Sequence, residues 1–154
     1  MARLFSQTQT QTQTQTQIQL RLGLAEAERA RDAILAVLTP SDNPVALAIA
    51  DEHGVPILLL RQDGAPARML SRARSKAYTA ATLGLDTVEF RDKHVKATQR
   101  TLDDWGDPML TTLQGGLVIT VHGTVIGGIA MSGNTTARDE ALATVGLQAM
   151  QLSA

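Results

Sequence analysis

Three stretches of the chain place their apolar residues at the three- and four-residue spacing of amphipathic helices. These stretches are residues 25–38, 67–83 and 134–150. Pro40 follows the first stretch and Gly84 follows the second, and both residue types commonly mark the end of a helix. In the third stretch, Thr136 followed by Asp139 resembles a capping box in which Asp replaces the usual Glu. The pattern therefore predicts three long helices. The inner face of the last one would carry Ala141, Leu142, Val145 and Ala149.

Shorter apolar runs, each bounded by turn residues, predict two β-hairpins. They join residues 45–50 to 57–60 and residues 117–121 to 124–131. The second hairpin has the two-residue turn His122-Gly123, and glycine suits such a turn. Because both runs of the first hairpin are apolar throughout, we expect this hairpin to be central and covered on both faces.

Two further segments complete the predicted fold. Ile18, Leu20 and Leu22 alternate with polar residues and predict a strand over 18–22. Residues 85–112 show a weaker pattern, with a helix expected near 93–102. Because strands that are neighbours in sequence form hairpins, the sheet should be antiparallel rather than doubly wound and parallel. The predicted fold class is α+β, with about five strands and helices packed against the sheet.

The N-terminus carries an alternating Gln-Thr tract over residues 7–17. We therefore divide the chain into a low-complexity tract, residues 1–17, and a single domain, residues 18–154. Composition alone is typical of a flexible tail. The period of two also fits an extended strand with Thr on one side and Gln on the other. Because the tract has no apolar face, we expect it to become ordered only through pairing between subunits.

Composition excludes several classes of function. The formal net charge is -1, so the chain has neither the basic surface of a nucleic-acid-binding protein nor a polybasic patch for a membrane. The sequence has 0 cysteines, which excludes disulfides and cysteine nucleophiles. No apolar run approaches the length of a membrane span. These features favour a cytoplasmic protein.

Three segments resemble the GlcG/HbpS-like haem-binding family, which includes the C-terminal domains of PduO-type proteins. The first segment is Ala48-Ile49-Ala50-Asp51-Glu52-His53-Gly54 followed by Arg61-Gln62-Asp63-Gly64-Ala65, and the second is Lys76-Ala77-Tyr78-Thr79-Ala80. The third comprises Gly115-Gly116, the run from Gly123 to Gly133, and Asp139-Glu140. Departures from the family pattern are Val118, Asn134, Ala137-Arg138 and the unmatched Trp105. The resemblance implies a profilin-like fold and binding of haem or a corrinoid-type tetrapyrrole. It also implies homo-oligomers with an even number of subunits, octamers among them.

Candidate ligand-binding residues flank the second hairpin. They are Gly115, Gly116, Ser132, Gly133 and Asn134. The last helix begins just beyond them, and the free N–H groups of a helix N-terminus suit a carboxylate such as a haem propionate. The same glycines could simply form turns. Tyr78 joins the candidate ligand residues through the resemblance of Lys76-Ala77-Tyr78-Thr79-Ala80 to the family motif.

Three candidates could move a proton: Lys76, His94 and Asp139. Each has a structural alternative, because Lys76 could be a surface residue and Asp139 could interact with a helix dipole. His94 is also a candidate axial ligand of haem iron. No histidine pair has metal-site spacing, so no other metal site is predicted.

Three functions remain open from the sequence. The first is a binding module for haem or a related tetrapyrrole, used in carriage, sensing or degradation. The second is an enzyme that acts on a small oxygenated acid by proton transfer at the glycine-rich turns. The third is an accessory protein that stabilises a partner enzyme.

Overall fold

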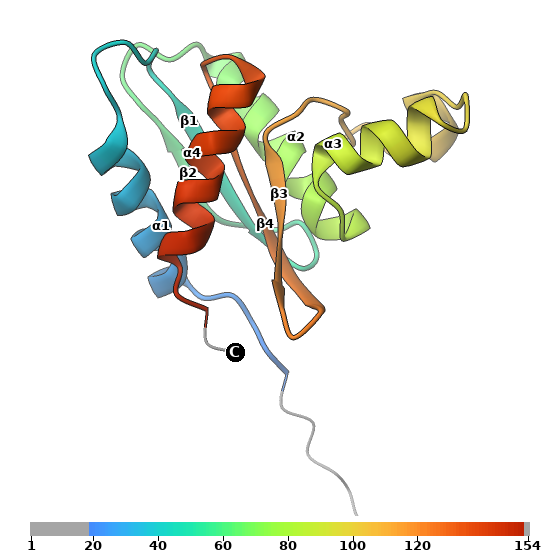
Figure 1. The fold of residues 1–154 in the computed structure, drawn as a ribbon, viewed down its shortest axis with the longest axis horizontal. Coiled ribbons are helices and arrows are strands. Elements are labelled where there is room, and N and C mark those ends of the chain that lie inside the picture. The colour runs from blue at the N-terminus through green and yellow to red at the C-terminus, as the bar shows by residue number, and fades with distance from the viewer. Residues whose placement is uncertain (1–18, 153–154) are drawn as a thin grey trace, which may run out of the picture.

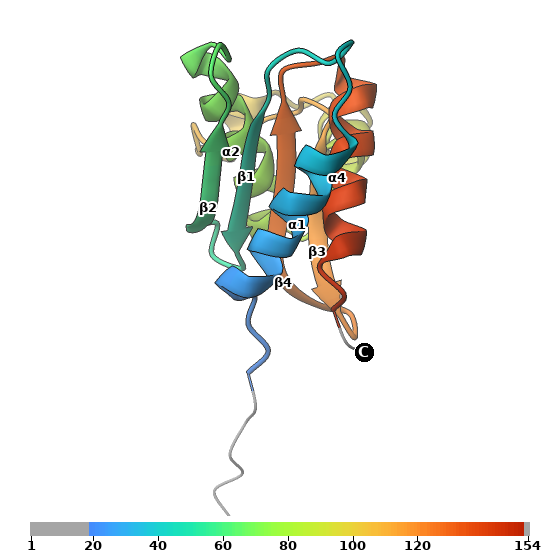
Figure 2. The same cartoon turned by 90° about the vertical axis from the view of Figure 1, so that its left-hand side faces the viewer.

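The computed structural model describes residues 19–152, so the Gln-Thr tract lies outside the described part of the chain. The α-helices and strands are α1 (Leu24–Val37), β1 (Ala46–Asp51), β2 (Pro56–Arg61), α2 (Ala67–Leu83), α3 (Thr87–Glu89), β3 (Gly116–Val121), β4 (Thr124–Ser132) and α4 (Thr136–Ala149). A π-helix over Phe90–Lys96 and a 3-10 helix over Leu102–Trp105 lie between α3 and β3. The strands form an antiparallel sheet in the order β2-β1-β4-β3. Helix α2 covers one face of this sheet, and α1 and α4 cover the other (Figures 1 and 2). The fold class is α+β, as predicted.

The predicted helices and hairpins form where the local signals place them. Helix α2 has the predicted bounds, and Gly84 ends it in the left-handed conformation with φ +68. The turn of the second hairpin uses His122 at φ +50 and Gly123 at φ +75, the backbone pattern that tight hairpins favour. No helix among residues 19–152 is long and apolar enough to cross a membrane.

The central strand β1 divides the core into two layers. Leu47 and Ile49 point toward α1 and α4, where large side chains fill the interior. Ala46, Ala48 and Ala50 point toward α2, whose own buried stripe is mostly alanine. Small residues on both sides let α2 lie close to the sheet. A Cβ on Gly128 would collide with the carbonyl of Ala77.

Two predictions about strands are wrong. Residues 19–23 form no strand, so the described sheet has four strands rather than about five. Leu22 instead inserts into the core, 7% exposed, and α1 begins two residues later. The first hairpin is also not covered throughout. Strand β1 is buried, whereas β2 lies at the edge of the sheet and has no fully buried residue. Its apolar run reflects one covered face and contact with β1.

Three smaller expectations are also corrected. The helix expected at 93–102 instead spans 87–96, where residues 90–96 take the wider turns of a π-helix. The cap of α4 is Thr135 rather than Thr136, because its side chain accepts a hydrogen bond from the Arg138 N–H. Ala141 is exposed, whereas Leu142 is buried. The first and last corrections follow from packing, which periodicity in a weakly patterned sequence does not determine.

Candidate functional site

Two glycine-containing turns meet at one end of the sheet, where β3 begins and β4 ends. Gly115 precedes β3, and Gly133 follows β4. Because β3 and β4 are antiparallel neighbours, the two turns lie at the same end of the sheet, close to the start of α4. A Cβ on Gly115 would lie 3.0 Å from Lys76 Nζ and 3.3 Å from the Cβ of Asp139. The fold therefore brings two of the three proton-transfer candidates to the predicted turns.

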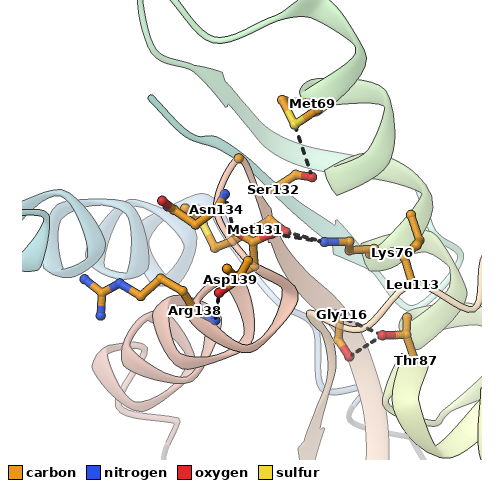
Figure 3. A network of polar contacts seen from close by, with 12 residues as sticks. Met69, Lys76, Thr87, Leu113, Gly116, Met131, Ser132, Asn134, Arg138 and Asp139 are labelled. Atoms are coloured by element: carbon orange, nitrogen blue, oxygen red, sulfur yellow. Dashed lines mark hydrogen bonds and ion pairs between the residues drawn. The ribbon is translucent and has the colours of Figure 1, made fainter. Parts of the chain in front are cut away.

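Lys76 projects from the buried side of α2 toward this end of the sheet (Figure 3). The residue is only 1% exposed. Its Nζ donates a hydrogen bond of 2.8 Å to the carbonyl oxygen of Met131 and lies 3.5 Å from Asp139 Oδ2. Burial lowers the pKa of Lys76, and the carboxylate of Asp139 opposes that shift. Lys76 is thus an interior lysine, not a surface one.

The carboxylate of Asp139 faces Lys76 from the first turn of α4. It is 2% exposed, and its Oδ1 accepts a hydrogen bond of 3.0 Å from the backbone N–H of Asn134. Burial raises the pKa of Asp139, while the Asn134 N–H and Lys76 oppose the rise. Burial therefore moves the pKa of Lys76 down and that of Asp139 up. This brings the ion pair and the neutral pair closer in free energy, which suits a pair that holds or releases a proton.

Gly116 and Ser132 flank the pair from inside the molecule. A Cβ on Gly116 would lie 2.6 Å from the carbonyl oxygen of Lys76 and 2.7 Å from Cγ2 of Thr87. Ser132 is 3% exposed, and its Oγ lies 3.8 Å from Sδ of Met69 on α2. The structural reason for both residues is therefore close packing between α2 and the sheet.

An open groove lies on the outer side of the same turns. It has a volume of about 470 Å³ and is lined by Leu38, Thr39, Asp42, Asn43, Pro44, Gln62 and Asp63. Asn134 Oδ1 accepts a hydrogen bond of 2.9 Å from the Asn43 N–H. Among the described residues, the Asn134 Nδ2 is buried without a hydrogen-bond partner. Asn134 thus joins the buried pair to the groove.

Asp42, which lines this groove, is paired with Arg138 on α4. Arg138 donates two hydrogen bonds of 2.8 Å, from Nε and Nη2, to the carboxylate of Asp42. The guanidinium holds the pKa of Asp42 well below its usual range. The sequence analysis noted Arg138 only as a departure from the family pattern and did not predict this pair, because the two residues lie 96 positions apart. Met131 was also missed, since it contributes a backbone carbonyl that no side-chain pattern reveals.

Tyr78 lies away from the buried pair. Its hydroxyl donates a hydrogen bond of 2.8 Å to Asp107 Oδ2, and its ring lies against Gly54 in the β1–β2 turn. Tyr78 therefore links α2 to two surface segments. The predicted ligand residues thus do not all gather in one place.

His94 lies in a third place, within a projecting segment that we call the lobe, residues 87–110 (Figure 1). Its ring stacks on Phe90 with centroids 6.5 Å apart and meets the ring of Trp105 edge-on at 6.4 Å. Within residues 19–152, no group hydrogen-bonds to the His94 imidazole, and the buried Trp105 Nε1 also lacks a partner. A groove of about 460 Å³ runs along the lobe beside Asp107 and Leu110.

Potential metal ligands do not cluster in the described structure. Within residues 19–152, no three His, Cys, Asp or Glu side chains gather in a way that could hold a metal ion. The side chain of His53 is 74% exposed, and His122 occupies the hairpin turn. An iron held within a macrocycle needs only one or two axial ligands from the protein, so this finding does not bear on haem.

A four-stranded antiparallel sheet with α2 on one face, and glycine turns around a buried Lys–Asp pair, define a small α+β domain. The sequence profile of the family described as "Haem degrading protein HbpS-like" matches residues 22–148, and the chain belongs to this family. A 15.0 kDa protein of Citrobacter freundii, encoded in the dhaT-dhaS intergenic region, is 31% identical over 105 residues. The match covers 68% of this chain and 74% of that protein.

Two solved structures share the fold. The crystal structure of a double mutant of Streptomyces reticuli HbpS has a TM-score of 0.75 and 28% identity, covering 86% of this chain and 89% of that one. The crystal structure of a PduOC:heme complex has a TM-score of 0.75 and 24% identity, covering 84% and 95% of the two chains. These likenesses confirm the family resemblance seen in the sequence motifs.

Proposed function

We propose that this protein binds haem or a related tetrapyrrole through the lobe that carries His94 and Trp105. The family is described as haem-degrading, and a protein of the same fold is known as a haem complex. The observation that carries the proposal is the aromatic cluster of the lobe. Its imidazole has no hydrogen-bond partner within residues 19–152, and its indole N–H is likewise unpartnered.

The chemistry of this cluster fits a flat, iron-containing macrocycle. A neutral imidazole nitrogen is a common axial ligand of haem iron. The rings of Phe90, His94 and Trp105 meet stacked or edge-on. Phe90 is fully buried, so a planar apolar ligand would contact the partly exposed rings of His94 and Trp105. The π-helical turns over 90–96 belong to a class of backbone irregularity that is frequent at functional sites.

Different residues of the lobe would contact different parts of the ligand. His94 would supply the axial nitrogen, and the Trp105 N–H would donate to a polar edge of the ligand. Asp103 and Asp107 line the neighbouring groove, so propionate groups would lie away from them by charge repulsion. Haem, when bound, supplies an iron centre that can change its oxidation state.

Visible spectroscopy tests this proposal. Haem titrated into the purified protein should give a shifted Soret band with saturable binding. His94→Ala should weaken or abolish the shift, whereas His53→Ala removes an exposed histidine and serves as the matched control. No spectral change in the unmodified protein would overturn the proposal. An equal response in both variants would remove His94 as the ligand.

A second candidate function rests on the buried Lys76–Asp139 pair. We propose as the alternative an enzyme that moves a proton on a small oxygenated acid, because burial shifts the two pKa values toward each other. Asn134 connects this pair to the groove of about 470 Å³. Opening of the turns at Gly115 and Gly133 would be needed for substrate to reach Lys76.

Deuterium uptake tests the enzymatic candidate. Small carboxylic acids with an acidic C–H would be incubated with the protein in D2O and followed by NMR. Exchange in the unmodified protein that is lost in Asp139→Asn, with His94→Ala unaffected, would support the alternative. Absence of exchange across the panel would contradict it.

We further propose that the chain self-associates with an even number of subunits, octamers being the expectation from the family resemblance. Several apolar side chains on α1 remain exposed in the single chain, namely Leu24, Leu35 and Val37 at 55%, 38% and 42%. Burying exposed apolar side chains is a common reason for homo-oligomers. A monomeric mass by light scattering would contradict this proposal.

A further inference from the structure

The outer surface of α1 carries a row of side chains that do not belong to the core. Four residues, separated by four, three and four positions, lie along one side of the helix, and we call this row the outer stripe. They are Leu24, Glu28, Arg31 and Leu35. Helices that pair side by side in coiled coils use the same spacing.

The outer stripe is exposed in the single chain. Its two leucines are 55% and 38% exposed, and the side chains of its glutamate and arginine are 48% and 32% exposed. Helix α4, which lies beside α1 on the same face of the sheet, contacts other residues of α1 (Figure 2). Arg29 donates a hydrogen bond of 2.8 Å to the Met150 carbonyl, and Ile34 packs against Gly146. Contact with α4 therefore leaves the outer stripe accessible to a partner.

The order of residues in the outer stripe is complementary to itself. Along the helix the stripe reads Leu, Glu, Arg, Leu, and in the reverse direction it reads Leu, Arg, Glu, Leu. When two copies lie antiparallel, Leu24 of each copy faces Leu35 of the other, and Glu28 of each faces Arg31 of the other. A two-fold interface has this property, because residue i contacts residue j and residue j contacts residue i. The stripe therefore fits a second copy of this chain.

The two charged residues determine the orientation of such a pair. In a parallel pair, Glu28 would face Glu28 and Arg31 would face Arg31, and like charges repel. In the antiparallel pair, each Arg31 gains a carboxylate from the other copy. This carboxylate adds to that of Asp32 in its own chain, which lies 2.8 Å from Arg31 Nε. Charge complementarity therefore favours the antiparallel arrangement.

We propose that α1 pairs with α1 of a second copy, antiparallel and along the outer stripe. This proposal rests on the proposed self-association and adds its surface, its partner residues and its orientation. A two-fold contact joins subunits in pairs, in keeping with an even subunit number. The 14 residues of α1 are about 21 Å long, whereas a stable interface buries about 800 Å² on each partner. The α1 pair would therefore act together with further contacts in a closed oligomer.

Disulfide trapping tests the orientation, because the natural sequence has 0 cysteines. Within one chain, residues 24 and 35 are about 17 Å apart along α1, too far for a disulfide. A variant with both Leu24→Cys and Leu35→Cys should form a disulfide-linked dimer without reductant, whereas each single variant should stay uncross-linked. Leu24→Cys combined with Leu113→Cys, at a position 41% exposed and outside α1, is the matched control and should also stay uncross-linked. Dimers from the single variants would overturn the antiparallel orientation, and no cross-link in the double variant would overturn the pairing.

Charge reversal tests the contact between Glu28 and Arg31. Either Glu28→Arg or Arg31→Glu alone places like charges opposite each other, and the two-fold axis repeats this contact in every pair. Light scattering over a dilution series should show that each single variant dissociates at a concentration about tenfold higher than the unmodified protein. The double variant Glu28→Arg with Arg31→Glu restores opposite charges across the axis and should recover assembly. Lys93→Glu reverses an exposed charge that belongs to an i,i+4 ion pair in the lobe, and it should leave assembly unchanged.

The outcomes separate this proposal from self-association in general. Weaker assembly in both single variants, with recovery in the double variant, supports the α1 pair. An oligomer that neither charge reversal weakens would overturn pairing through α1 and leave the proposed self-association in place. A double variant no better assembled than the single variants would overturn the contact between Glu28 and Arg31. A monomeric unmodified protein would overturn both proposals.

Discussion

The polar groups at the buried end of the sheet and those in the projecting lobe differ in whether they have hydrogen-bond partners. Around Lys76 and Asp139, an ion pair and hydrogen bonds to Met131 and Asn134 occupy the charged groups, and solvent is excluded. In the lobe, the His94 imidazole and the Trp105 indole N–H lack partners among the described residues.

This difference separates two reasons for a polar residue in a small domain. A buried charge with its partners in place can hold the fold together, because breaking the pair leaves an uncompensated charge. A buried indole N–H without a hydrogen-bond partner does not stabilise the fold by a hydrogen bond, and it suits a ligand that supplies the missing partner. The comparison predicts that changes at the buried end alter stability, whereas changes in the lobe alter binding.

The largest effect should follow from removal of the buried cation. Lys76→Met leaves Asp139 buried without its counter-ion, and we expect a loss of about 3–5 kcal/mol in the free energy of unfolding, measured by urea denaturation. The double variant Lys76→Met with Asp139→Asn removes both charges and keeps an acceptor for the Asn134 N–H. It should recover at least half of the loss. If Lys76→Met were as stable as the unmodified protein, the pair would not hold the fold together.

A smaller effect should appear when two glycines with positive φ are replaced by alanine, because the loss of stability should differ between them. Gly115 has φ +118, and its added Cβ would lie 3.0 Å from Lys76 Nζ, so Gly115→Ala should cost about 2–3 kcal/mol. Gly106 in the lobe has φ +64 with nothing within 4 Å of an added Cβ, so Gly106→Ala should cost about 1 kcal/mol. Thermal unfolding of both variants measures the difference. Equal losses would show that the buried end is no more tightly packed than the lobe.

Trp105→Phe should change stability by less than about 1 kcal/mol, since the indole N–H makes no hydrogen bond within residues 19–152 and the ring contact with Phe90 can persist. Haem affinity should nevertheless fall if the N–H donates to the ligand. Chemical denaturation and haem titration of the same variant measure the two effects. A large loss of stability with unchanged haem affinity would reverse the roles assigned to the two regions.

The smallest effect should be a pH dependence confined to the buried end. Burial raises the pKa of Asp139 in the folded state, so its contribution to stability is present at low pH and is lost as pH rises through the folded pKa. Burial lowers the pKa of Lys76, so stability should rise again with pH between that lowered pKa and the ordinary lysine value. Urea denaturation across pH measures both changes in the free energy of unfolding. Asp139→Asn should remove the fall in stability that Asp139 causes as pH rises. If that fall remained in the variant, it would belong to another group.

Much of the fold could be predicted from the sequence because its signals are local. The period of α2, the left-handed Gly84 and the tight turn at His122-Gly123 each depend on neighbouring residues. The strand predicted at 18–22 failed because a strand also needs a partner, and period alone cannot supply one. The helix predicted in the lobe was wrong for a related reason, since the π-helical turns over 90–96 have no distinctive apolar period.

The candidate site was predicted only in part. The motifs identified Lys76, Asp139 and the two glycine turns, and these do meet in space. Tyr78 and His94 lie elsewhere, because residues on one helix or loop share a site only if they share a face. The Arg138–Asp42 pair joins distant segments and left no local signal.

The sequence by itself determined the three long helices, the two hairpins, the family and the identity of the chemically active side chains. These depend on local periodicity, turn chemistry and motif spacing. The tertiary structure alone decided that Lys76 is buried against Asp139 and that His94 lies beside Trp105. It also decided that the Val118 N–H at the outer edge of β3 donates a hydrogen bond to Asp86. Each of these results depends on which distant segments pack together. That choice minimises unpaired buried groups and exposed apolar surface over the whole chain, so no single stretch of sequence contains it.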